Sequence, residues 1–138
     1  MKALIITVMA GATLLSAATP AAAVDEAGIE ARYTPALGLC LDTPDGQTTA
    51  GTVGCIAEEL KVQGAALNVA YRRLTADMNP RQQAGLRNAQ RAWIAFRDAD
   101  CASRQDWEWG SMSTVAANFC VLRRTVERTI ELETFGPD

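Results

Sequence analysis

The stretch LRNAQRAWIAFRDADC, residues 86–101, carries the longest uninterrupted helical pattern in the chain. At 100° per residue its larger apolar side chains fall within one wide arc, whereas Arg91 and several alanines occupy the opposite side. The residues that we predict to face the core are Leu86, Ala89, Trp93, Ile94, Phe96 and Cys101. The sequence therefore predicts an amphipathic helix with one buried face, around which the rest of the chain is organised.

Four polar residues lie on or beside this predicted buried face: Gln90, Arg97, Asp98 and Asp100. A buried guanidinium has five donors to satisfy, and breaking a buried ion pair costs about 3–5 kcal/mol. We interpret the four residues as a structural polar network that joins helices through carboxylates and backbone carbonyls. The alternative is a binding or catalytic constellation, because both arrangements give the same sequence pattern.

A second helix is predicted before this stretch, over residues 55–77, where apolar residues recur at alternating four- and three-residue steps. Asn79 and Pro80 end that helix and begin the next, and Gln82 stands where a capping box places Glu or Gln. The helix that contains residues 86–101 is then expected over residues 80–104. Because the connection is so short, the two helices should be antiparallel neighbours.

A third helix is predicted to start near Ser111 and to end before Gly136 and Pro137, which are typical residues beyond a helix C-terminus. We expect three charged residues of this helix to lie on its solvated face: Arg124, Arg128 and Glu131. The predicted fold is all-α: a small three-helix antiparallel bundle stapled by two disulfides, with an irregular N-terminal arm.

The first 23 residues show the basic, apolar and small-residue regions of a secretory signal peptide, with cleavage expected after Ala23. No cysteine follows that cut, and no later run approaches the roughly 20 apolar residues of a membrane span, so we expect neither a lipid anchor nor a span. Turn residues dominate residues 24–54, which we predict to be a mostly irregular arm, with a turn of helix from Ala27 to Arg32 as an alternative for that part, and residues 55–135 should form the helical domain. The mature protein is expected to be periplasmic or secreted.

Removal of Lys2 with the signal peptide leaves 12 basic and 16 acidic residues, a net charge of −4. This balance disfavours nucleic acid and anionic membranes as partners and favours a basic protein. It does not predict an oligomeric state.

Four cysteines in a small exported domain predict two disulfides: Cys40, Cys55, Cys101 and Cys120. Cys101 and Cys120 lie where two helices of a hairpin can face each other, so we favour this pair together with Cys40–Cys55. A Cys55–Cys101 bridge remains possible because both residues lie near the same end of the bundle.

The chain has no histidine, which removes the commonest general base, and it has no CxxC pair, so a zinc site is a poor alternative. Glu58 and Glu59 are adjacent and point in different directions on a helix, which makes them a poor acid/base pair. We therefore predict that the protein is not an enzyme and that it has no cofactor or metal.

The connection between the second and third helices holds two acidic and two tryptophan side chains in four positions: Asp106, Trp107, Glu108 and Trp109. Buried tryptophan contacts are common anchors of protein interfaces, so we predict a partner-binding loop. In the alternative interpretation, both indole rings fold back over the end of the bundle.

Residues distributed from Cys40 to Leu132 resemble the LprI-like lysozyme-inhibitor family. The matching motifs are Leu67-Asn68-x-x-Tyr71-x-x-Leu74, Leu86-x-x-x-Gln90-x-x-Trp93-x-x-x-Arg97-Asp98-x-x-Cys101, Gly110-Ser111, Cys120 and Thr125-x-x-Arg128-Thr129-x-Glu131-Leu132. The resemblance implies a small exported helical protein with four cysteines that binds and inhibits a c-type lysozyme. The alternative is a disulfide-stapled envelope interaction module that binds another protein or a cell-wall fragment and does not inhibit lysozyme.

Overall fold

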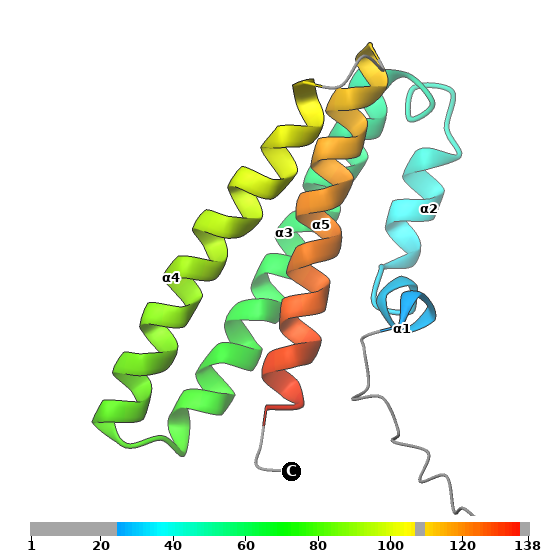
Figure 1. The fold of residues 1–138 in the computed structure, drawn as a ribbon. Coiled ribbons are helices and arrows are strands. Elements are labelled where there is room, and N and C mark those ends of the chain that lie inside the picture. The colour runs from blue at the N-terminus through cyan, green and yellow to red at the C-terminus, as the bar shows by residue number, and fades with distance from the viewer. Residues whose placement is uncertain (1–24, 107–109, 136–138) are drawn as a thin grey trace, which may run out of the picture.

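The computed structural model describes residues 25–106 and 110–135. Three long helices form its body, and each runs antiparallel to the one before it (Figure 1): α3 Thr49–Ala76, α4 Pro80–Ala102 and α5 Ser111–Glu133. The shorter elements are α1 Glu26–Glu30, α2 Pro35–Leu41 and the 3-10 helix η1 Ser103–Asp106. The described residues contain no strand, so the predicted all-α class is confirmed. None of the described helices is both long and apolar enough to cross a membrane.

Helix α5 is the central element, since it packs against α3, α4 and α1. One core cluster contains Val115 and Leu122 of α5 together with Ile56 of α3, and a second contains Leu132 of α5 with Leu86 of α4. Two buried hydroxyls of α5 are satisfied within the helix, because Thr125 Oγ1 and Thr129 Oγ1 each donate to the carbonyl four residues earlier, at 2.8 and 2.9 Å.

The N-terminal arm is more regular than its turn residues predict, because it contains α1 and α2 and because α3 begins at Thr49 rather than Cys55. Residues that favour a helix N-terminus explain where α1, α2 and α3 begin. Asp25 accepts a hydrogen bond from Gly28 N at 2.7 Å, Pro35 occupies the first turn of α2, and Thr48 accepts one from Gly51 N at 3.0 Å. The prediction of an irregular arm was therefore wrong: short helices here are stabilised by burying Ile29 and Leu37.

Two glycines allow the tight connection between α2 and α3. A Cβ atom at Gly46 would lie 2.0 Å from the Cys40 carbonyl oxygen, and one at Gly51 would lie 1.9 Å from the Asp45 carbonyl oxygen. The glycine content of this segment therefore reflects close backbone approach rather than an irregular chain.

Both disulfides join the cysteines that the predicted helix positions favoured, Cys40 with Cys55 and Cys101 with Cys120. The first ties α2 to α3, and the second ties the end of α4 to α5. The alternative Cys55–Cys101 bridge is not the one formed.

The arm is also held by the buried side chain of Glu59 on α3, which is 3% exposed. Its carboxylate accepts hydrogen bonds from Thr34 N at 2.9 Å, from Thr34 Oγ1 at 2.5 Å and from Gln63 Nε2 at 2.7 Å. The same Gln63 nitrogen donates to the Arg32 carbonyl oxygen at 2.7 Å. Adjacent Glu58 is exposed and pairs with Lys61, so the expectation that the two glutamates point in different directions is confirmed.

Helix α4 begins with the predicted capping box, in which Asn79 Oδ1 accepts from Gln82 N at 3.0 Å and Gln82 Oε1 accepts from Asn79 N at 2.9 Å. Its buried face is narrower than the wide arc predicted from the sequence. Ile94 is 42% exposed and Phe96 is 57% exposed, and Ala89 is exposed as well. The prediction that these three residues face the core was wrong, because α4 contacts its neighbours along one line that includes Leu86, Trp93 and Cys101.

We expect Glu59→Ala to lower the free energy of unfolding by about 2–3 kcal/mol, because it leaves buried donors of Thr34 and Gln63 without an acceptor. Urea unfolding of the oxidised protein measures this change. Glu58→Ala is the matched control and should shift stability by no more than about 0.5 kcal/mol. Equal effects of the two substitutions would contradict the role given to Glu59.

We expect Phe96→Ala to change stability by about 0.5 kcal/mol or less, because the ring is mostly exposed, whereas Leu122→Ala should cost about 2–5 kcal/mol. Thermal or urea unfolding compares the two variants. A large loss for Phe96→Ala would show that α4 is rotated relative to the arrangement described above.

Candidate functional site

The predicted binding loop follows η1 at one end of the bundle. Trp107, Glu108 and Trp109 lie outside the described residues, and of Asp106 only the backbone, at the end of η1, is described. The structure describes the segments on both sides of the loop. The Cys101–Cys120 disulfide joins them, and Gly110 enters α5 with φ of 58°, a left-handed conformation that favours glycine.

Of the four polar residues predicted to form one network, Arg97 and Asp98 pair with each other, whereas Gln90 and Asp100 pair with residues outside the set. Gln90 Oε1 accepts from Arg128 Nε at 2.6 Å. Arg97 pairs with neighbouring Asp98 at 2.7 Å and donates from Nη1 to Thr125 Oγ1 at 3.4 Å. Two of these contacts join α4 to α5, but they do not form a single network.

Trp93 lies between these polar contacts on α4 and is half-buried. The guanidinium carbons of Arg97 and Arg128 lie 5.0 and 6.0 Å from the centre of its indole ring. Cation–π attraction therefore adds to the hydrogen bonds that orient these two arginines.

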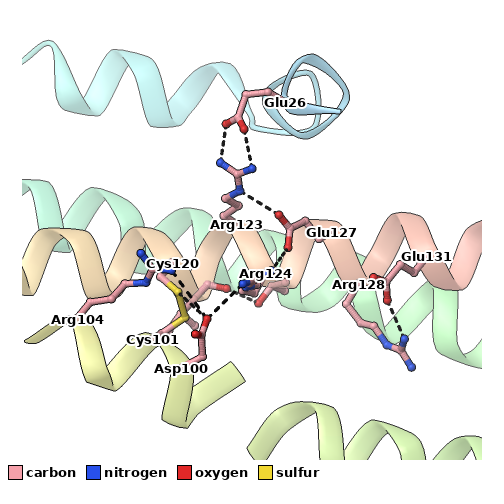
Figure 2. Close-up of polar contacts among 12 residues, drawn as sticks. Glu26, Asp100, Cys101, Arg104, Cys120, Arg123, Arg124, Glu127, Arg128 and Glu131 are labelled. Carbon is pink, nitrogen blue, oxygen red and sulfur yellow. Dashed lines mark hydrogen bonds and ion pairs between the residues drawn. A yellow bond between two sulfur atoms is a disulfide. The ribbon is translucent and has the colours of Figure 1, made fainter. Parts of the chain in front are cut away.

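Asp100, the remaining member of the predicted network, takes part in a different arrangement, a chain of ion pairs across α5 (Figure 2). Figure 2 shows the arm on one side of α5 and the end of α4 on the other, with the charged side chains between them. We call this set the ion-pair chain, and its members alternate in charge: Glu26, Arg123, Glu127, Arg124, Asp100 and Arg104.

The geometry of the ion-pair chain differs along its length. Arg123 is the best-satisfied cation, since its two Nη atoms contact Glu26 at 2.6 and 2.9 Å and its Nε donates to Glu127 at 2.9 Å. Arg124 contacts Glu127 at 3.1 Å and Asp100 at 3.3 Å. Arg104 is held more loosely, because its Nη2 lies 3.9 Å from Asp100.

The prediction of a solvated face on α5 was wrong for two of its three residues. Arg124 and Arg128 are half-buried and contact α4 through Asp100 and Gln90. Glu131 is exposed, as predicted, and pairs with Arg128 at 2.8 Å. On α5, arginines and glutamates are three or four residues apart, a spacing typical of ion pairs on one helix. This spacing was the signal in the sequence that these arginines are paired. The arm residue Glu26 gave no such signal.

A trough of about 510 Å³ runs over α5 between the arm and η1. Arg123, Arg124 and Glu127 line it from α5. Four further residues of the lining are Glu30, Tyr33, Arg104 and Phe119. The trough therefore combines charges of both signs with two aromatic rings.

Tyr33 has the one phenol in this trough, and its pKa is raised above the ordinary value. Burial is the largest cause; the positive charge of Arg123 opposes it, and the carboxylates of Glu26, Glu127 and Glu30 raise the pKa further. The hydrogen bond that Arg123 donates to Glu127 is the largest cause that raises the pKa of Arg123. At neutral pH the trough therefore holds a neutral phenol beside charged guanidinium groups.

Charge is distributed unevenly along the bundle. Arg72, Arg73, Arg81 and Arg87 have no ion-pair partner among the described residues, and they lie on the last turns of α3 and the first turns of α4. Asp42 and Asp45, both exposed, lie in the connection between α2 and α3. Figure 1 places this connection and the one between α4 and α5 at the same end of the bundle, opposite the hairpin that joins α3 to α4.

One group in the described residues has the composition of a metal site: Asp100, Cys101 and Cys120, whose ligand atoms lie within 4.8 Å of one another. Both sulfur atoms belong to a disulfide, so neither is available as a thiolate ligand. We do not assign a metal to this group.

We expect the phenol absorbance of the folded protein to include a group that titrates above the usual tyrosine pKa of about 10, and Tyr33→Phe to remove it. Because the folded pKa is raised, this tyrosine stabilises the folded state fully below the unfolded pKa and loses that contribution as the pH rises through the folded pKa. Spectrophotometric titration checks the first expectation, and the pH dependence of unfolding above pH 10 checks the second. A titration curve unchanged by Tyr33→Phe would contradict both.

These features define a disulfide-stapled helical protein in which six charged groups form ion pairs across a central helix. A family model described as lysozyme inhibitor LprI matches residues 40–132, which is more than half of the chain. The chain belongs to this family. No curated protein and no solved structure matches it.

Proposed function

We propose that the protein is exported to the periplasm or the medium and there binds and inhibits a c-type lysozyme. Membership of a family of lysozyme inhibitors is the observation that carries this proposal. The two disulfides support the location, because such bonds persist in oxidising compartments. Here the protein acts as a binding partner and not as an enzyme.

The end of the bundle that carries Asp106, Trp107, Glu108 and Trp109 is the proposed docking surface. Asp42 and Asp45 lie at the same end, whereas the unpaired arginines lie towards the other. Because c-type lysozymes are basic, this polarity would orient the inhibitor during approach and would disfavour contact through the arginine-rich end.

The two tryptophans of the loop are the second proposed contribution to lysozyme binding, after electrostatic orientation. A disulfide and Gly110 fix the two ends of the connection, so less conformational freedom would be lost when the loop binds. Tryptophans that enter a partner's pocket from such a loop would act as the central anchors of the interface.

The alternative function is a stapled envelope interaction module with another protein or cell-wall partner. It uses the same scaffold and the same exported location. The two functions differ in one outcome, namely whether lysozyme activity falls when the protein is added.

Lysis of cell-wall substrate by a c-type lysozyme should fall as the oxidised mature protein is titrated, and the inhibition should weaken as salt is raised. Replacing Trp107 and Trp109 together by alanine should weaken inhibition by about tenfold or more, as expected for interface anchors. An unchanged melting temperature of this variant would separate a lost contact from a lost fold. The matched control is the double variant Arg81→Gln/Arg87→Gln, which should inhibit at least as well as the parent.

Full inhibition by the tryptophan variant would place the docking surface elsewhere on the molecule. Absence of both inhibition and binding would instead favour the envelope interaction module. Inhibition that does not respond to salt would contradict the electrostatic part of the proposal.

A further inference from the structure

We propose that the trough over α5 binds a short peptide that has both a free ammonium and a free carboxylate terminus. Its volume of about 510 Å³ falls within the range of roughly 300–1,000 Å³ that is typical of sites for small ligands. The proposal does not depend on lysozyme binding, because the described lining of the trough comes from the arm, η1 and α5.

Arg104 would bind the carboxylate. Its only ion-pair partner among the described residues is Asp100, at 3.9 Å, which is beyond hydrogen-bond distance. Its Nε atom is buried and has no hydrogen-bond partner in the part of the chain that the structure describes. The Arg104 side chain as a whole is 43% exposed, so part of it is accessible to a ligand in the trough. A carboxylate there would form charge-assisted contacts with the guanidinium.

Glu30 would bind the ammonium from the opposite wall of the trough. It is exposed, and within the described ranges it has neither a hydrogen bond nor an ion pair through its side chain. Glu30 follows Glu26 by one helical turn on α1, but Glu26 is occupied by Arg123. The hydroxyl of Tyr33, in the same lining, could accept a further hydrogen bond from the ammonium.

Between these two groups the trough is lined by charges of both signs and by two aromatic rings. The ion-pair chain is neutral only as a whole, because the charges of Arg123, Arg124 and Arg104 offset those of Glu26, Glu127 and Asp100. Phe119 and the ring of Tyr33 supply apolar surface there. A ligand with a carboxylate at one end, an ammonium at the other and apolar surface between them fits the positions of Arg104, Glu30, Phe119 and Tyr33 in this lining.

Tri-alanine is a suitable probe, and its binding is measured by NMR chemical-shift titration of the isotope-labelled mature protein. We expect saturable shifts of trough residues at millimolar concentration. N-acetyl tri-alanine and tri-alanine amide should each bind about tenfold more weakly, because each lacks one charge-assisted contact.

Two substitutions test the ends separately. Arg104→Gln should weaken binding of tri-alanine but leave binding of tri-alanine amide, which has no carboxylate, nearly unchanged. Glu30→Gln should also weaken binding of tri-alanine but leave binding of N-acetyl tri-alanine, which has no ammonium, nearly unchanged. The matched controls are Arg87→Gln and Glu58→Gln, which change the same charges outside the trough and should bind tri-alanine like the parent. Amide spectra of all four variants confirm that each is folded.

Absence of saturable shifts, or equal affinity for the free and blocked peptides, would overturn the proposal. So would equal weakening by the matched controls, which would indicate a response to net charge alone. Because lysozyme is absent from these measurements, their outcome is independent of the lysis assay.

Discussion

The carboxylate of Glu59 is buried on α3, and the position of the whole N-terminal arm depends on how it is satisfied. Burying a charge is costly unless hydrogen bonds replace its lost hydration. Thr34 supplies two of those bonds at the start of α2, and Gln63 supplies a third while also holding the carbonyl of Arg32. This set of contacts aligns the arm against α3 and so allows Glu26 to reach Arg123 on α5.

The disulfides fix two of the connections between elements, one between α2 and α3 and one between α4 and α5. Cys40–Cys55 closes a separation of 15 residues beside the Glu59 contacts, and Cys101–Cys120 closes 19 residues beside the predicted loop. In the chain-entropy model a loop of this length is worth about 3 kcal/mol per bridge. That contribution is a large share of the stability of a domain of this size.

With the arm and the end of α4 both fixed to α5, most charged side chains near the trough are paired with one another. These pairs join three segments across one helix, which explains why arginine and glutamate alternate on α5 without forming an acid/base centre. Glu30 and Arg104 remain the least satisfied charges of that surface. We propose different partners for two parts of the molecule: a protein for the loop at residues 106–109 and a small dipolar ligand for the trough.

The sequence alone predicted the three long helices, the capping box at Asn79 and Gln82, and the preferred pairing of the cysteines, because these depend on local periodicity and on residues close to helix ends. Only the tertiary structure showed that the arm is helical and that Phe96 is exposed. It also gave the partners of Arg123 and Arg124, which lie 97 and 24 residues away in Glu26 and Asp100. Local pattern carries no information on which distant side chain a charged group will meet, because that depends on how the helices pack.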